Sequence, residues 1–167
     1  AIIQQAVTPI APHETAGTLH DKLMTQGAQL VLQTVDSIAN GTCQTQLQNK
    51  EITYAEAPKI YKETCKINWE ANGTAIEQLI RGMSPYPTAW TEMPLNGELL
   101  QLKVYDAIFE PAQHNEEVGK FIIEKKTMKV TVKDGYIQLL ELQLPAKQRM
   151  KTTDLLNGFS FDNTTIL

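Results

Sequence analysis

A run of positively charged side chains near the end of the chain is the feature best suited to chemistry. Between residues 120 and 151 there are eight cations and three anions, so this segment carries a net charge of +5. Three of the cations, Lys147, Arg149 and Lys151, are spaced two residues apart and would project on one side of an extended segment. Such a group suits contact with phosphates. A solvated, lysine-rich strand edge that prevents sheet-to-sheet pairing is an equally good interpretation.

The sequence contains no constellation that indicates catalysis or metal binding. The three histidines, His13, His20 and His114, are scattered, and the two cysteines match no metal-ligand spacing. His20 precedes Asp21, but adjacent residues of a helix do not face each other, which favours a solvated histidine. No glycine-rich phosphate loop or nucleophile motif is present. We therefore expect neither a catalytic residue nor a metal ligand in this sequence.

The overall composition is that of an ordinary globular protein. The 167 residues suffice for one domain, or for one domain and part of another. The formal net charge of -4 argues against a protein that binds nucleic acid over its whole surface. No apolar run approaches a membrane span, and residues 1–10 lack the basic and apolar regions of a secretory signal. Together with only two cysteines, this favours reduced thiols in a cytoplasmic protein.

Residues 67–93 are predicted to form a short helix, a rigid turn and the start of a strand. The helix carries one apolar stripe at helical spacing, formed by Ile76, Leu79, Ile80 and Met83. Thr74 and Glu77 have the spacing of a capping box, which places the helix start near them. Pro85 and Pro87 then end the helix and stiffen the turn.

From this turn onward the pattern is β. We predict strands at 98–109, 121–123, 128–133 and 136–144, a hairpin turn at Asp134-Gly135 and a short final helix at 152–156. Leu140, Leu142 and Leu144 are expected to continue the inward face of the last long strand. Short strands with turn signals and no crossover helices favour a small, mostly antiparallel barrel.

The first part of the chain is predicted to be helical and then extended. Residues 2–10 have the composition of a short strand, and residues 15–40 that of a helical segment broken near Gly27. The helical segment has apolar side chains at Leu19, Leu23, Leu30, Val31, Val35 and Ile38. Residues 42–66 are polar and aperiodic, which predicts an extended connector with a short helical turn at 59–65.

Several strings in the sequence resemble those of methionyl-tRNA formyltransferases. I-N-W (67–69), I-R-G-M (80–83) and S-P-Y-P-T-A-W (84–90) are similar to the family's I-D-W, I-R-A-F and P-x-P-x-A. K-Q-R-M-K-T-T-D-L-L-N-G (147–158) is similar to its G-K-x-M-x-x-x-D-L-L-N-G, with Ala146 in place of the glycine. E-T-A-G-T-L-H-D-K-L (14–23) resembles the segment that closes the family's catalytic domain. The resemblance covers nearly the whole sequence and is most specific at 139–158.

The resemblance implies a mainly β fold with flanking helices. It places an OB-like antiparallel β-barrel at 67–167, an inter-domain linker at 42–66 and, at 1–41, helices left over from a Rossmann-like catalytic domain. The family's catalytic asparagine, histidine and aspartate match no residue of this chain. The full-length enzyme would transfer formyl from 10-formyltetrahydrofolate to the amino group of methionyl initiator tRNA in translation initiation. This chain alone would then be inactive and bind no cofactor.

The resemblance also implies that the barrel holds the tRNA backbone. The first candidates for phosphate contacts are Lys147, Arg149 and Lys151. The next are Lys125, Lys126 and Lys129, followed by Arg81 on the polar face of the predicted helix.

Two other functions are open alternatives, although the sequence supports them less well. One is the structural C-terminal domain of a sugar-nucleotide formyltransferase. The acidic net charge is the observation that most favours this alternative. The other is a free-standing OB-like binding module, which would leave the first forty residues without a purpose.

The apolar side chains of the helical segment at 15–40 lead to a separate prediction about association. Without the sheet that it would cover in the family, its apolar side chains would be exposed to water at a free-energy cost. We expect it either to fold onto the barrel or to associate with a second copy of the chain.

Overall fold

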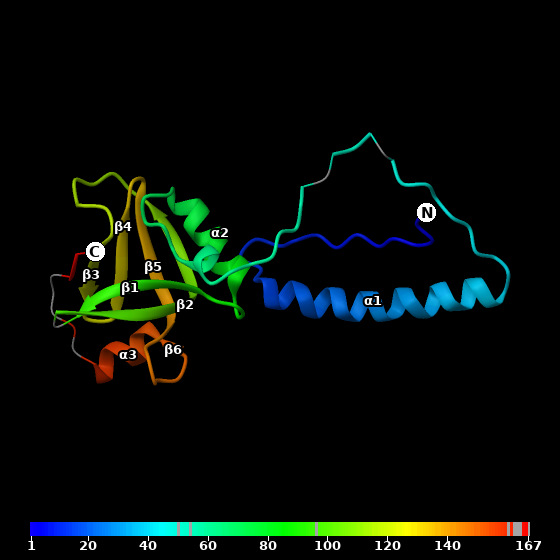
Figure 1. Cartoon of the computed structure of the whole chain (residues 1–167). Coiled ribbons are helices and arrows are strands. Elements are labelled where there is room, and N and C mark those ends of the chain that lie inside the picture. The colour runs from blue at the N-terminus through cyan, green and yellow to red at the C-terminus, as the bar shows by residue number, and fades with distance from the viewer. Residues whose placement is uncertain (50, 54, 96, 160, 162–164, 167) are drawn as a thin grey trace. The chain divides into compact units, whose positions relative to one another are not determined.

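The computed structural model describes residues 1–49, 51–53, 55–95, 97–159, 161 and 165–166. The chain divides into two compact units, Ala1–Lys59 and Ile60–Leu167 (Figure 1). The first unit contains one long helix, and the second contains the sheet. Among the described residues, no helix is both long and apolar enough to cross a membrane.

The first unit is built on helix α1, Ala16–Ala39. Thr15 begins the helix, because its Oγ1 accepts a hydrogen bond from the Thr18 N–H at 3.2 Å. Gly41, with a φ of 67°, follows the helix end as its spacing predicts. The predicted break near Gly27 is wrong: α1 runs through this position, where glycine costs only about 1 kcal/mol relative to alanine. In residues 2–10 the predicted strand is also wrong, since Ile2 alone forms a bridge, to Gln46.

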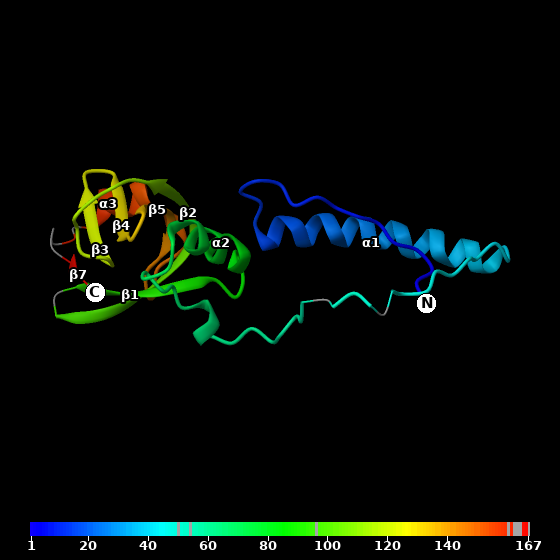
Figure 2. The ribbon, with the colours of Figure 1, turned by 90° about the horizontal axis from the view of Figure 1, so that it is seen from above.

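The second unit is a seven-stranded antiparallel sheet with a few helices, which confirms the predicted mainly β class. Its strands are β1 Ala89–Leu95, β2 Glu98–Pro111, β3 Lys120–Glu124, β4 Thr127–Val132, β5 Gly135–Gln143, β6 Met150–Lys151 and β7 Thr165–Ile166. They follow the order β1-β2-β5-β4-β3-β7, and β6 pairs with β5. The sheet curls around its core, so β1 and β7 approach each other (Figures 1 and 2).

Three short helical segments accompany the sheet. They are η1 Glu63–Cys65, α2 Gly73–Met83 and α3 Thr152–Gly158. Helix α2 lies against β2, β5 and β1, whereas α3 contacts β5, β4 and β6 (Figure 2). The predicted stripe of α2 is confirmed, because Ile76 and Ile80 are buried and Leu79 and Met83 pack against the same core. Trp69 and Phe121 meet edge to face in this core, with ring centroids 6.2 Å apart.

The start of α2 differs from the prediction. No capping box forms between Thr74 and Glu77, because the N-cap is Asn72, two residues before Thr74. The Gly73 N–H instead donates to Oδ1 of Asp134, at 2.8 Å, from the turn between β4 and β5. The free N–H at the helix start is therefore satisfied by an acceptor 61 residues away in the chain and not by the predicted local motif.

Two irregularities interrupt the long β2–β5 pair. Val104 pairs with Leu142, Asp106 with Glu141 and Ala107 with Leu139, so Tyr105 and Leu140 are each an extra residue in their strand. The alternation of core-facing and outward-facing residues along β5 is consequently shifted by one residue at Leu140. Leu142 and Leu144 are buried as predicted, but Leu140 is only half-buried and Leu139 takes the place in the core.

The β4–β5 hairpin forms as predicted, one residue earlier than expected. Val132 pairs with Gly135, so Lys133 and Asp134 are the turn residues. Gly135 begins β5 with a φ of 155°, and a Cβ there would lie 2.1 Å from the Glu110 carbonyl oxygen. Because this approach excludes any side chain, the hairpin depends on glycine at this position.

Candidate nucleic-acid interface

The turn between β3 and β4 presents Lys125 and Lys126 to solvent. Both are exposed, and within the described part of the chain neither makes an ion pair. Lys126 also lines a cleft of about 310 Å³, and Lys151 lines the same cleft from β6. Two of the predicted cations, 25 residues apart in sequence (151 minus 126), are therefore brought together by the sheet. Asp106 and Glu141 also line this cleft, so its charge is mixed.

Two of the other predicted cations are already engaged within the protein. Lys129 lies 2.6 Å from Glu110 Oε2 and 6.0 Å from the centroid of the Tyr136 ring. Arg149 lies 2.5 Å from Glu141 Oε2, and this hydrogen bond raises the pKa of the guanidinium above its ordinary value. An RNA phosphate would have to compete with these carboxylates, which lowers the net gain from each contact.

The segment from Lys147 to Lys151 is not the single extended strand that the spacing predicted. Pro145 and Ala146 form a turn, with Ala146 at a φ of 57°, and strand β6 contains only Met150 and Lys151. Lys147 follows the turn, and its carbonyl accepts from Nε2 of Gln143 at 2.9 Å. Lys147 and Arg149 therefore lie in the loop that follows the turn, and Lys151 lies in β6.

Arg81 lies in the last turn of α2 and is half-buried. Its side chain interacts with the rest of the protein, so it is not a freely exposed cation. At the end of a helix an arginine also interacts favourably with the helix dipole.

Sequence reasoning did not find a group of side chains that gathers at the outer face of β1 and β2, with Lys66 from the segment before α2 and Arg149 from the loop before β6. We call this group the outer row and define it as Lys66, Trp90, Lys103, Tyr105 and Arg149. Trp90 pairs with Lys103 across β1 and β2, and Lys103 pairs with Gln143 across β2 and β5. Directly paired residues point to the same face of a sheet. The alternation of Lys103 and Tyr105 with Leu102 and Val104 predicts that both face the side opposite these apolar residues, but it does not predict their pairing with Trp90 and Gln143.

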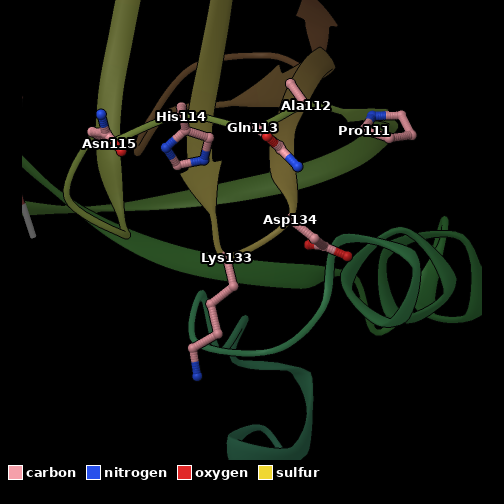
Figure 3. A pocket seen from close by; sticks show the side chains of 7 residues that line it. All are labelled: Pro111, Ala112, Gln113, His114, Asn115, Lys133 and Asp134. Carbon is pink, nitrogen blue, oxygen red and sulfur yellow. The ribbon is translucent and has the colours of Figure 1, made fainter.

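Another feature of this unit is an open cavity of about 870 Å³ beside the loop that follows β2. Figure 3 shows seven side chains along this cavity, with Lys133 pointing away from the loop. His114 Nε2 lies 2.7 Å from the carbonyl oxygen of Val132 and 3.0 Å from that of Gly135, so this nitrogen carries the proton. Its Nδ1 accepts from the Glu116 N–H. His114 is therefore engaged in holding the loop against the hairpin, and its ring nitrogens are not available for catalysis.

The described residues contain no group of three or more His, Cys, Asp or Glu side chains placed to hold a metal ion. The titratable groups of the second unit are instead distributed over its surface in ion pairs and cation–aromatic contacts. Such an arrangement can bind and orient a polyanion.

A curled antiparallel sheet accompanied by short helices defines the class of this unit as a mainly β domain. The chain belongs to the family described as formyl transferase, C-terminal domain, whose model matches residues 59–160. It is 44% identical over 163 residues to methionyl-tRNA formyltransferase of Flavobacterium johnsoniae, covering 98% of this chain and 52% of that protein. The enzyme of the same name from Bacteroides thetaiotaomicron is 42% identical, covering 95% of this chain and 51% of that protein. The chain thus spans about half the length of these relatives.

Solved structures of HypX from Aquifex aeolicus share the fold. A variant of HypX has a TM-score of 0.61 at 13% sequence identity, over 91% of this chain and 28% of that one. HypX in complex with tetrahydrofolic acid has a TM-score of 0.55 at 12% identity, over 83% of this chain and 26% of that one. At these identities the likeness concerns the fold alone.

Proposed function

We propose that this chain is the C-terminal, tRNA-positioning region of a methionyl-tRNA formyltransferase. The observation that carries the proposal is the 44% identity to an enzyme of that name over 98% of the chain. The complete enzyme would transfer formyl from 10-formyltetrahydrofolate to the amino group of methionyl initiator tRNA, in the cytoplasm. Its catalytic residues and its folate site would lie outside this chain, and we assign no residue here to either.

Within this proposal the second unit serves to hold RNA by its phosphates. Lys125, Lys126, Lys147 and Lys151 support it, because all four are exposed and make no ion pair in the described part of the chain. Arg149, Lys129 and Arg81 are secondary candidates, because each already has a partner within the protein. Contacts of this kind position an RNA without reading its sequence.

The domain plan is part of the same proposal. We infer an OB-like barrel at 67–167, a linker at 42–66, and at 1–41 a helix that covers the sheet of a Rossmann-like catalytic domain. A sugar-nucleotide formyltransferase would share this plan, but the relatives that match nearly the whole chain bear the name of the tRNA enzyme. In isolation, α1 would associate with a second copy, because its apolar side chains are exposed in its own unit.

A titration with initiator tRNA at several salt concentrations tests the proposal. Binding through four phosphate contacts should weaken about 100-fold between about 50 mM and 200 mM salt. Replacement of Lys125, Lys126, Lys147 and Lys151 by alanine should remove most of this dependence. The control is Lys22→Ala in the first unit, where Lys22 pairs with Glu14. Wild-type binding that does not change with salt would contradict phosphate contacts, and no binding at all would favour the sugar-nucleotide alternative.

A further inference from the structure

The outer row is a continuous set of contacts across three strands. Lys103 stands between Trp90 on β1 and Gln143 on β5, and Ala89, Val104 and Leu142 beside them point into the core. Tyr105, the extra residue of the β2 irregularity, remains on the outer face and donates its hydroxyl to Gln143 Oε1 at 2.7 Å. Alternation with the buried Val104 places Tyr105 on the same face as Lys103, and the irregularity leaves the next residue, Asp106, exposed as well.

Both aromatic rings of the row have cations close to their faces, two at Trp90 and one at Tyr105. The Nζ atoms of Lys62 and Lys66 both lie 5.1 Å from the centroid of the Trp90 ring, and the Arg149 guanidinium carbon lies 4.4 Å from that of Tyr105. The indole is fixed in turn, since its Nε1 donates to the carbonyl of Lys62 at 2.8 Å. A cation held over a ring has lost part of its freedom. Lys66 and Arg149 each also pair with a carboxylate, Glu92 and Glu141, with which an RNA phosphate would have to compete.

The charge of this surface is opposite to that of the whole protein. Lys62, Lys66, Lys103, Lys147 and Arg149 give five positive charges, and Glu92, Glu141 and Asp106 give three negative ones, leaving +2. The complete chain carries a net charge of -4. Lys103 is exposed at the centre of the row and makes no ion pair in the described residues. Concentrated positive charge interleaved with aromatic rings complements a nucleic-acid backbone better than a neutral partner.

We propose that the outer row is a further part of the RNA-binding surface, with Lys103 as its phosphate contact and Tyr105 as the residue that positions Arg149. The proposal rests on the tRNA-positioning function proposed above and names a surface that runs from Arg149 across β2 to Trp90 on β1. Glu141, the partner of Arg149, also lines the cleft of Lys126 and Lys151, so the outer row adjoins that cleft and extends the proposed surface to β1.

Lys103 provides the first test, because an exposed side chain can be changed without disturbing the core. In a tRNA titration, Lys103→Ala should weaken binding about 3- to 10-fold at low salt and lower the salt slope by about one. Lys103→Glu should weaken it more. The matched control is Lys133→Ala, which removes the same charge at the β4–β5 turn, where Lys133 lies 3.1 Å from Glu70. Equal effects of the two alanine variants would overturn the proposal, since only net charge would then matter.

Tyr105 provides the second test, because its ring and its hydroxyl can be removed separately. Tyr105→Phe keeps the ring beneath Arg149 and should bind within about twofold of the wild type, whereas Tyr105→Leu should weaken binding several-fold. If Tyr105 acts through Arg149, the double variant Tyr105→Leu/Arg149→Ala should bind as weakly as Arg149→Ala alone. Additive losses would contradict a positioning role. Thermal melting checks the fold of the leucine variant, and the Lys103 variants decide the proposal if that fold is lost.

The failure of this inference is distinguishable from that of the proposed function. Normal, salt-dependent tRNA binding by the Lys103 and Tyr105 variants, together with losses in the Lys125 and Lys126 variants, would refute the outer row alone. This outcome would assign the row to another partner, such as an acidic protein. Absence of salt-dependent tRNA binding by the unchanged protein would refute both proposals.

Discussion

The two cysteines of the chain occupy different environments. Cys65 is 1% exposed, with its thiol 3.4 Å from the carbonyl oxygen of Tyr61, whereas Cys43 is half-buried in the first unit. Burial, and secondarily the charge of Glu63, raise the pKa of the Cys65 thiol above its ordinary range. The thiolate is the reactive form of cysteine. Burial, which blocks access, and the raised pKa, which keeps the thiol protonated, therefore both slow the alkylation of Cys65.

At neutral pH we therefore expect iodoacetamide to modify Cys43 at least tenfold faster than Cys65 in the folded protein. Peptide mass spectrometry after timed alkylation measures both rates, and unfolding in urea should remove the difference. Equal rates without urea would contradict the burial of Cys65. Since the raised pKa favours the protonated thiol in the folded state, this contribution to stability is present at neutral pH and is lost as the pH rises through the folded-state pKa.

At the scale of elements, helix α2 contains two glycines with opposite surroundings. A Cβ on Gly73 would lie 2.0 Å from the ring of Phe109, whereas a Cβ on Gly82 would meet nothing within 4 Å. The first glycine allows the helix start to approach β2, and there its N–H reaches Asp134. The second has no such role and only weakens the helix.

We predict opposite effects for the same substitution at these two positions. Gly73→Ala should lower the free energy of unfolding by about 1–3 kcal/mol, because the Phe109 ring must shift. Gly82→Ala should raise it by about 0.5 kcal/mol through the better helix propensity of alanine. Urea denaturation followed by tryptophan fluorescence measures both, since Trp69 is buried in the same core. A stabilised Gly73→Ala protein would show that the helix start is not tightly packed.

At the scale of the whole molecule, α1 is a helix whose apolar side chains remain exposed within its own unit. None of its residues is buried, and Val31 and Leu32 are 62% and 67% exposed. Exposed apolar area costs roughly 25 cal/mol per Å², so an amphipathic helix of this length favours association.

We therefore predict a molecular mass that rises with concentration in light-scattering measurements. Val31→Gln/Val35→Gln should keep the protein monomeric, because both side chains are exposed on α1. Leu47→Gln is the control, since Leu47 is 85% exposed but lies outside the helix. A monomer at every concentration, with proteases cutting readily at 42–50, would show that the helix is simply solvated.

Much of the second unit was predictable from local pattern. The stripe of α2, the long strand β2, the hairpin at residues 133–135 and the final helix all depend on alternation, helical spacing or turn residues, which a single sequence displays. The continuous α1 was mispredicted because a glycine was given more weight than the favourable residues on either side of it.

The sequence by itself determined the mainly β character, the family and the presence of excess positive charge after residue 120. Only the tertiary structure decided which cations meet which partners: Arg149 with Glu141 and Tyr105, Lys129 with Glu110, and Lys103 beside Trp90. The reason is that periodicity is a property of neighbouring residues, whereas these contacts depend on strand register. A single extra residue such as Tyr105 resets that register, and no local pattern of this sequence marks the place where it does so.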